Sequence, residues 1–110
     1  MTWECFDGRF ETARPLNELG TLFDMTGLAL EVAHGTVRSN DAAIAIDTCA
    51  HAQHARATAY SLNGRIDAAR HDPEDVLSRL AMAMEADGIR FTLRLLDGGG
   101  DARVTYESDR

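Results

Sequence analysis

The order of apolar and polar positions along this 110-residue chain predicts short strands interrupted by two helices. Apolar residues that alternate with polar ones are typical of half-buried strands, and apolar residues spaced by three and four are typical of helices. In the first half, alternation predicts strands over residues 2–6, 9–12, 28–33 and 42–48. The wider spacing predicts a helix that begins at Pro15 and ends at Gly27. Asp7-Gly8 separates the first two strands and predicts a tight hairpin, because this dipeptide favours left-handed backbone angles.

The second half repeats this order of elements. Alternation predicts strands over residues 57–62, 65–69, 89–96 and 102–107. Asn63-Gly64 predicts a second tight hairpin between the first two of these strands. A helix is expected to begin at Asp72, whose side chain can cap the first turn, with Pro73 in that turn. Gly88 is expected to end this helix.

The two halves also resemble each other residue by residue. Residues 7–14 and 63–70 are identical at four of eight positions, and each stretch precedes a proline, a leucine pair, a glycine and an alternating strand. This shared order predicts a duplicated β-β-α-β-β unit, with repeat one at about residues 1–50 and repeat two at about residues 56–110. Since one helix cannot bury its apolar face alone, both should pack on a shared antiparallel sheet. We expect one α+β domain over residues 1–110, pseudo-twofold, with about eight short strands and two helices.

The net charge of the chain indicates which kinds of macromolecule it can bind. The chain has 18 acidic and 11 basic residues, a formal net charge of −7, and every basic residue is arginine. Such a surface repels phosphate backbones, so nucleic acid is not an expected partner. The lack of lysine rules out catalysis through a Schiff base or a phosphate-loop lysine. An acidic surface instead attracts basic proteins over long range.

The expected location is the reducing cytoplasm. No stretch approaches the roughly 18 apolar residues of a membrane span. The first residues also lack the basic region and apolar run of an export signal. Cys5 and Cys49 are the only cysteines, which does not fit a disulfide framework.

Cys49, His51 and His54 form the densest group of metal-binding side chains in the sequence. If the segment were helical, His51 and His54 would share a face and supply two of the four ligands that a closed zinc site needs. Asp47 or His34 could complete the site across a sheet, but nothing in the sequence requires it. We therefore expect no bound metal and no cofactor.

A cysteine nucleophile with a histidine base is a second arrangement that the sequence allows. Cys5 alternates with Trp3 in a predicted strand and should lie in the core, as free cysteines commonly do. Cys49 lies at a strand end. Because neither thiol is accompanied by an oxyanion loop or a third orienting residue, the pattern favours a binding protein over an enzyme.

Four arginines occupy equivalent places in the two predicted repeats, namely Arg9 with Arg65 and Arg14 with Arg70. One interpretation is that the four arginines line a pseudo-symmetric cleft and bind an anionic ligand there. The other is that each pairs with a neighbouring carboxylate.

Three methionines lie near the predicted helix ends, namely Met25, Met82 and Met84. We expect them to be buried. Exposed methionines would instead indicate an adaptable contact surface.

Three classes of function fit these observations. Our leading hypothesis is a non-catalytic protein-binding module, such as an immunity protein, antitoxin or inhibitor, that neutralises a basic protein partner. The alternatives are a small-molecule-binding domain or small enzyme that uses the cleft between the repeats, and a homodimeric structural subunit. Under the leading hypothesis the partner-binding residues are acids of the first half: Glu4, Glu11, Glu18, Asp24 and Glu31. Strand alternation is expected to point Glu4 and Glu31 to water rather than into the core.

Overall fold

The computed structural model describes residues 3–53 and 56–108. Its strands are β1 (Trp3–Thr12), β2 (Leu30–Ala33), β3 (Thr36–Ser39), β4 (Ile44–Gln53), β5 (Thr58–Asp67), β6 (Arg90–Leu96) and β7 (Ala102–Glu107). Its helical elements are the 3-10 helix η1 (Leu16–Leu19) and the α-helices α1 (Gly20–Asp24) and α2 (Pro73–Ala86). The protein is therefore α+β, as predicted.

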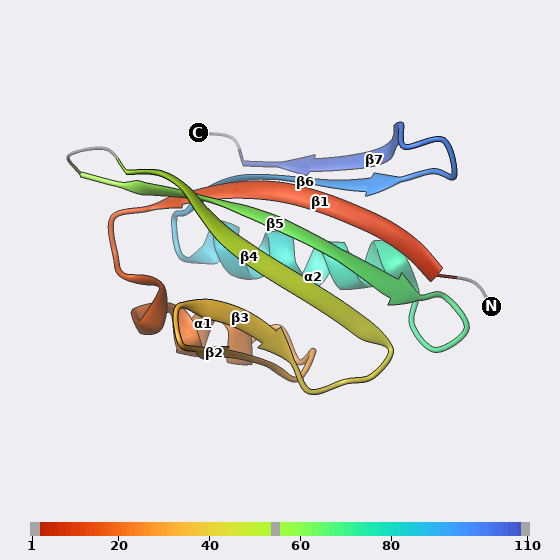
Figure 1. Ribbon diagram of the computed structural model, residues 1–110, viewed down its shortest axis with the longest axis horizontal. Helices are drawn as coiled ribbons and strands as arrows, with labels where there is room; N and C mark the ends of the chain where they lie inside the picture. The colour runs from red at the N-terminus through yellow and green to blue at the C-terminus, as the bar shows by residue number, and fades with distance from the viewer. Residues whose placement is uncertain (1–2, 54–55, 109–110) are drawn as a thin grey trace.

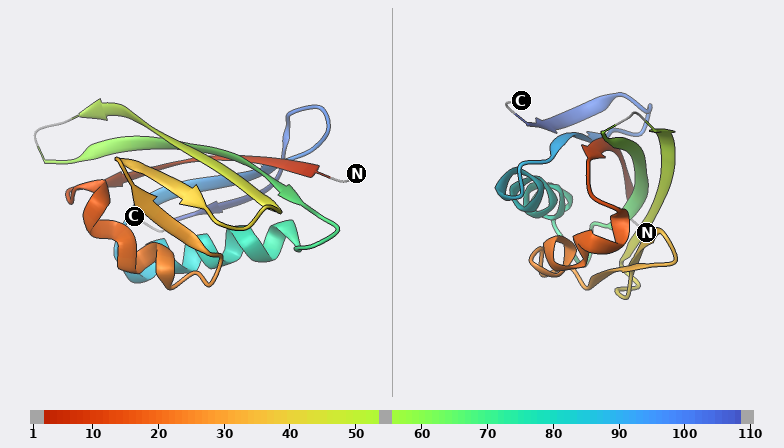
Figure 2. Two further views of the ribbon diagram at one scale, coloured as in Figure 1. Left: turned by 60° about the horizontal axis from the view of Figure 1, so that its bottom comes forward. Right: turned by 90° about the vertical axis from the view of Figure 1, so that its left-hand side faces the viewer.

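The strands form two sheets. Five of them make one antiparallel main sheet in the order β4-β5-β1-β6-β7, and β2 pairs with β3 separately. α2 and the η1–α1 segment lie on the same side of the main sheet, with the β2–β3 hairpin beside them (Figures 1 and 2). No element in the described part of the chain covers the opposite side, which we call the outer face (Figure 2).

The core fills the space between the main sheet and the helices. Its largest fully buried side chains come from β1, η1, α1, β3, β5, α2 and β6: Phe6, Phe10, Leu19, Phe23, Val37, Leu62, Ile66, Leu77, Leu80, Met84, Leu93 and Leu95. Removing this apolar surface from water is the main favourable term in folding. None of the helices in residues 3–53 and 56–108 is long and apolar enough to cross a membrane.

Both predicted tight hairpins are wrong. Asp7-Gly8 lies inside β1 and Asn63-Gly64 lies inside β5, and the two ten-residue strands pair with each other along their whole length. These glycines have no positive φ, which is the property that a hairpin turn would have used.

The two glycines instead allow close packing within the sheet. Gly64 pairs with Phe6, and a Cβ at Gly64 would meet the Phe6 ring at 2.5 Å and clash with the carbonyl oxygen of Ala45 on the neighbouring strand. Gly8 has the same role toward Leu93, whose Cδ2 would lie 2.5 Å from an added Cβ. A glycine inside a strand commonly marks such a close approach.

The internal duplication is not confirmed. After β1 the chain forms the short η1 and α1 and then β2, which belongs to the separate two-stranded sheet. After β5 it forms the 14-residue α2 and then β6, which lies inside the main sheet. The described residues hold seven strands rather than about eight: β1 and β5 each replace two predicted short strands, and β3 is a strand that was not predicted.

The predicted ends of α2 are confirmed. The Asp72 side chain accepts a hydrogen bond from the Glu74 backbone N–H, and Pro73 is the first helical residue. Gly88 follows the helix at φ +73°, a left-handed conformation that glycine adopts without strain. The first predicted helix is shorter than expected, because it begins as η1 without a side-chain cap and α1 ends at Asp24.

A true two-residue hairpin turn lies between β2 and β3. Its residues, His34 and Gly35, both have positive φ, at 54° and 75°, as a type I′ turn requires. The hairpin is held to the main sheet by a buried hydrogen bond of 3.0 Å from the Val37 backbone N–H to the Thr48 Oγ1. β3 therefore contacts β4 through this hydrogen bond as well as through packing.

Candidate functional site

The side of the molecule that carries the helices is strongly acidic. We call the exposed surface of residues 14–25 and 72–87 the helical face. It has two basic side chains, Arg14 and Arg79, and each forms an ion pair with a neighbouring carboxylate, Asp87 and Asp75 respectively. Its seven acidic residues are Glu18, Asp24, Asp72, Glu74, Asp75, Glu85 and Asp87. The helical face therefore has an excess of five negative charges, most of the net −7 of the chain.

The outer face of the main sheet is almost balanced in charge. Its positions are those that alternate with the buried ones, and their charged residues are Asp7, Arg9, Glu11, Asp47, Arg65, Asp67, Arg90, Arg94 and Glu107. Asp7 and Arg94 form a two-pronged ion pair with contacts of 2.8 and 2.6 Å. These hydrogen bonds raise the pKa of the Arg94 guanidinium. Opposite charges are interleaved here, so this face lacks the excess of negative charge that the helical face carries.

Two methionines are exposed on the helical face, which corrects the expectation that they are buried. Met25 is 72% exposed and Met82 is 69% exposed, and they are the exposed large apolar side chains of the described residues. Met84 is buried in the core, as expected. Methionine is flexible and polarizable, and exposed methionines are typical of surfaces that adapt to a partner.

A groove of about 260 Å³ runs between α1 and the C-terminal half of α2. We call it the α1–α2 groove. Ala83 and Ala86 of α2 contribute small side chains to its lining, and Met25 lines it from the end of α1. Glu18 and the Arg14–Asp87 ion pair also line it. The groove thus combines an apolar anchor point with an acidic border.

A second groove, of about 490 Å³, lies between α2 and β7. We call it the α2–β7 groove. Met82 and Glu85 line it from α2, and Tyr106 lines it from β7. The Tyr106 hydroxyl donates a hydrogen bond of 3.2 Å to the Glu74 carbonyl oxygen, which ties β7 to the start of α2.

Two of the five predicted partner-binding acids lie on the helical face. Glu18 belongs to η1 and Asp24 ends α1, and both are exposed. Among residues 3–53 and 56–108, neither has an ion-pair partner. Their negative charges are therefore available to a partner.

The other three predicted acids lie elsewhere. Glu4 is half-buried near the start of β1 and forms a 2.8 Å ion pair with Arg103. Glu11 lies near the other end of β1 on the outer face. Glu31 is exposed on β2, directly across the hairpin from Arg38. The five residues thus do not form one continuous patch.

The four predicted cleft arginines are not brought together either. Arg9 and Arg65 both belong to the outer face, and the Arg65 guanidinium lies 5.5 Å from the centre of the Trp3 ring. Arg14 follows β1 and Arg70 follows β5, and these strands are antiparallel. The two arginines therefore lie beyond opposite ends of the sheet.

The structure does not bring the thiols and histidines of the described residues together into one group. Cys5 is exposed on the outer face, so its predicted place in the core is wrong; Cys49 is exposed too, and both thiols are free. His51 is exposed on β4, and His54 lies outside the described residues. Within the described part of the chain, no three His, Cys, Asp or Glu side chains are grouped to hold a metal ion.

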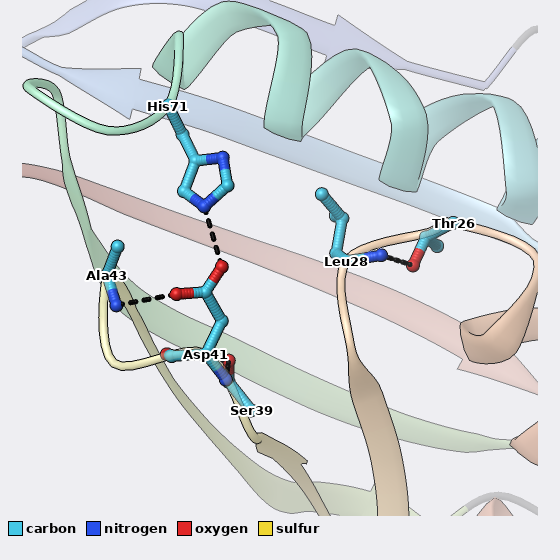
Figure 3. Close-up of polar contacts among 6 residues, drawn as sticks. All are labelled: Thr26, Leu28, Ser39, Asp41, Ala43 and His71. Carbon is cyan, nitrogen blue, oxygen red and sulfur yellow. Dashed lines mark hydrogen bonds and ion pairs between the residues drawn. The ribbon is translucent and has the colours of Figure 1, made fainter.

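Asp41 and His71 form a polar pair that the sequence pattern did not reveal, because they lie 30 residues apart. The Asp41 carboxylate accepts a 2.9 Å hydrogen bond from the Ala43 backbone N–H and contacts the His71 Nε2 at 2.7 Å (Figure 3). The Ala43 N–H, followed by His71, lowers the pKa of Asp41. The pair joins the loop before β4 to the loop before α2, and among the described residues no hydroxyl or thiol is bonded to the imidazole.

We expect Asp41→Asn to reduce the free energy of unfolding at pH 7 by about 1 kcal/mol, since both partners are partly exposed. The pKa of Asp41 is lower when folded than when unfolded, so its contribution is present above the unfolded pKa and is lost as pH falls through the folded pKa. Urea denaturation of wild type and variant between pH 7 and pH 3 measures this difference. The expectation would be contradicted if the difference in the free energy of unfolding between wild type and variant stayed constant down to about pH 3, because Asp has an unperturbed pKa of about 3.9.

No family model, curated protein or solved structure matches this chain. Its function must therefore be inferred from its surface chemistry.

Proposed function

We propose that this protein is a non-catalytic binding module that neutralises a basic protein partner, in the manner of an immunity protein, antitoxin or inhibitor. The observation that carries the proposal is the combination, on the helical face, of excess negative charge with the exposed Met25 and Met82. The binding site is the α1–α2 groove with its acidic border. Free cysteines at two exposed positions fit the reducing cytoplasm as the place of action.

The two parts of this surface have separate roles in binding. Unpaired carboxylates at Glu18 and Asp24 raise the rate of encounter with a positively charged partner. Met25 supplies affinity, because full burial of a methionine side chain contributes about 1.5–3 kcal/mol. An apolar anchor surrounded by charged rim residues is the usual anatomy of a protein interface.

The small-molecule alternative has weaker support. The polar hollow of the outer face has about 320 Å³ and is lined by Asp7, Arg9, His51 and Arg94 among others. Arg94 is already bonded to Asp7 in this hollow. Of the four arginines that the sequence placed in a cleft, Arg9 is the one that lines this hollow.

A photo-crosslinking experiment tests the proposal in the native host. A benzoyl-phenylalanine residue at Met25 should capture a basic protein, and the same residue at exposed Ala45 on the outer face should not. The captured protein is then purified and its binding to the unmodified chain is measured. An acidic captured protein, or equal capture at both positions, would contradict the proposal.

We expect the double variant Glu18→Arg/Asp24→Arg to associate with the captured partner about tenfold more slowly at low salt, with a smaller change in the dissociation rate. Association of wild type should also slow as salt rises, because screening weakens the attraction. The matched control is Asp47→Arg, which reverses an exposed charge on the outer face. Stopped-flow or surface-plasmon kinetics measure both effects. An association rate that is independent of salt and of these two acids would refute electrostatic steering by the helical face.

A further inference from the structure

β7 is an edge strand of the main sheet. It is the last strand in the order β4-β5-β1-β6-β7, and in the described part of the chain β6 is the only strand that pairs with it (Figure 1). The pairing with β6 is continuous from Val104 to Glu107, and the register shifts between Ala102 and Val104. The stretch of β7 after this shift is therefore a regular strand edge, which a further strand can extend.

The backbone groups of Thr105 and Glu107 point away from the sheet. The Ser108 backbone N–H donates a 3.0 Å hydrogen bond to the Phe91 carbonyl oxygen, so Ser108 faces β6. Consecutive residues of an antiparallel strand direct their N–H and C=O groups to opposite sides. Tyr106 therefore faces β6 as Ser108 does, while Thr105 and Glu107 offer their N–H and C=O groups to a further strand.

The α2–β7 groove lies beside this free edge and contains apolar side chains. Thr105, Tyr106 and Glu107 line it from β7, and Ala81 and the 69% exposed Met82 line it from α2. A strand added to β7 would alternate its side chains between the two faces of the sheet, so every second one would lie over the groove. An apolar side chain there would remove Met82 from water, which stabilises the complex.

The charged side chains that line the groove are acidic. They are Glu85 of α2 and Glu107 of β7, and no arginine is among the lining residues that the structure describes. Both glutamates are exposed, and neither has an ion-pair partner among the described residues. The groove therefore attracts a positively charged occupant.

The start of α2 adds further negative charge. The Tyr106 hydroxyl reaches this first turn, where it donates its hydrogen bond to the Glu74 carbonyl oxygen. Burial raises the pKa of this hydroxyl, and three carboxylates of the turn raise it further: Glu74, Asp72 and Asp75. Nearby negative charge disfavours the ionised phenol, so these carboxylates act on the groove as well.

A second copy of this chain does not fit the free edge. Its own β7 carries the same Glu107 and its net charge is −7, so the two edges would repel each other. Arg103, the basic residue of β7, is left out at the register shift and forms its ion pair with Glu4. The occupant that the charges favour is therefore basic.

The other edge of the main sheet is less accessible to a further strand. β3 contacts β4 through the hydrogen bond from the Val37 N–H to the Thr48 Oγ1. The pairing of β4 with β5 is also interrupted by a register shift between Ala50 and Ala52. Bulges and covering segments are the usual means by which proteins block an edge strand.

We propose that β7 binds an extended basic segment of a partner protein by strand addition, through backbone hydrogen bonds to Thr105 and Glu107. The segment becomes the sixth strand of the main sheet. Its apolar residues lie over the α2–β7 groove against Met82, and its alternate lysine or arginine residues lie beside Glu107. This inference goes beyond the proposed function, because it concerns a second surface and holds whether or not a partner binds the α1–α2 groove.

A synthetic peptide tests strand addition on the full chain. The probe is acetyl-Lys-Val-Lys-Val-Lys-Val-Lys-amide, whose valines can lie over the groove while its lysines lie on the outer face. Titration to about 2 mM, followed by NMR, should show saturable binding. Hydrogen exchange of the Thr105 and Glu107 amides should slow at least about twofold in the bound protein, because both N–H groups become hydrogen-bonded.

Two variants of the edge should weaken binding of the probe. Glu85→Arg/Glu107→Arg should weaken it about tenfold, because two attractive charges become repulsive. Thr105→Pro should weaken it as well, since proline lacks the N–H that the added strand needs and edge strands tolerate proline. Circular dichroism of each variant verifies that the fold is retained.

The matched control is Glu18→Arg/Asp24→Arg, which makes the same change in charge beside the α1–α2 groove. It should change the affinity for the probe by about twofold or less, since long-range attraction is screened by salt. A second control is a peptide with the same lysines and valines in two blocks. Without alternation it cannot place apolar residues on one side of a strand, so it should bind at least about fivefold more weakly.

Strand addition at β7 would be refuted by a probe that does not bind, by binding that leaves the exchange of Thr105 and Glu107 unchanged, or by equal affinity for the two peptides. Binding that resists both edge variants would refute it too. If the probe is lost only in Glu18→Arg/Asp24→Arg, it occupies the α1–α2 groove. That result overturns the β7 site and leaves the proposed function standing.

Discussion

Gly64→Val is expected to reduce the free energy of unfolding by about 3 kcal/mol, the upper part of the range for overpacked sites. The melting temperature should fall by at least about 12 °C, given roughly 4 °C or more per kcal/mol in a domain of this size. The reason is steric: a Cβ at Gly64 would clash with the Ala45 carbonyl oxygen and meet the Phe6 ring at 2.5 Å. A backbone oxygen in the middle of a five-stranded sheet cannot move aside cheaply.

Two further variants identify the cause of this loss. Gly98→Val places the same side chain in the turn between β6 and β7, where nothing lies within 4 Å of an added Cβ, and should change stability little. Gly64→Asn distinguishes a turn from a strand, because asparagine tolerates the left-handed angles of a turn but also carries a Cβ. We expect Gly64→Asn to destabilise the protein nearly as much as valine. Thermal denaturation measures all three, and an asparagine variant as stable as wild type would restore the hairpin interpretation.

Phe10→Ala should have the largest effect, a loss of about 4 kcal/mol in the free energy of unfolding. Phe10 is 1% exposed in the central strand β1. Its ring stacks on Tyr60 with centroids 5.1 Å apart and meets the Phe23 ring edge-on at 6.5 Å. One side chain thus joins β1, β5 and α1, so its removal leaves a cavity where the sheet meets the first helical segment.

Urea denaturation measures this loss, and hydrogen exchange locates it. Because Phe23 belongs to α1, amide protection in α1 should decrease more than in α2. Phe10→Leu serves as the conservative control and should cost about 1.5 kcal/mol or less. A loss below about 1 kcal/mol for the alanine variant would show that the ring contacts of Phe10 contribute little, contrary to the usual cost of 3–5 kcal/mol.

Prediction from sequence succeeded where the signal was local. The start of α2 requires a cap at Asp72 and a proline at position 73, and Gly88 supplies the positive φ after it. Each of these needs only the residue and its immediate neighbours. The alternating strands β2, β6 and β7 were predicted for the same reason, since side chains on a strand change face at every step.

Prediction from sequence failed at Asp7-Gly8 and Asn63-Gly64, because glycine occurs in strands and in turns for different reasons. Glycine permits the positive φ of a hairpin, and it also permits the close approach of a neighbouring strand. Gly8 and Gly64 serve the second purpose, which depends on Leu93 and Phe6 respectively. Neither neighbour is near its glycine in sequence, so no local pattern could distinguish the two. The predicted duplication depended on those hairpins, and so did the cleft of four arginines.

The sequence by itself determined the α+β class, the bounds of α2 and the overall acidity, because composition and local spacing decide these properties. Only the tertiary structure decided which surface is acidic. Glu18 from the first half and Glu85 from the second both belong to the helical face, while the charges of β1, β5 and β6 nearly balance on the outer face. It also decided that Met25 and Met82 are exposed. The physical reason is that burial and electrostatic potential are sums over neighbours in space, which the chain brings together only when it folds.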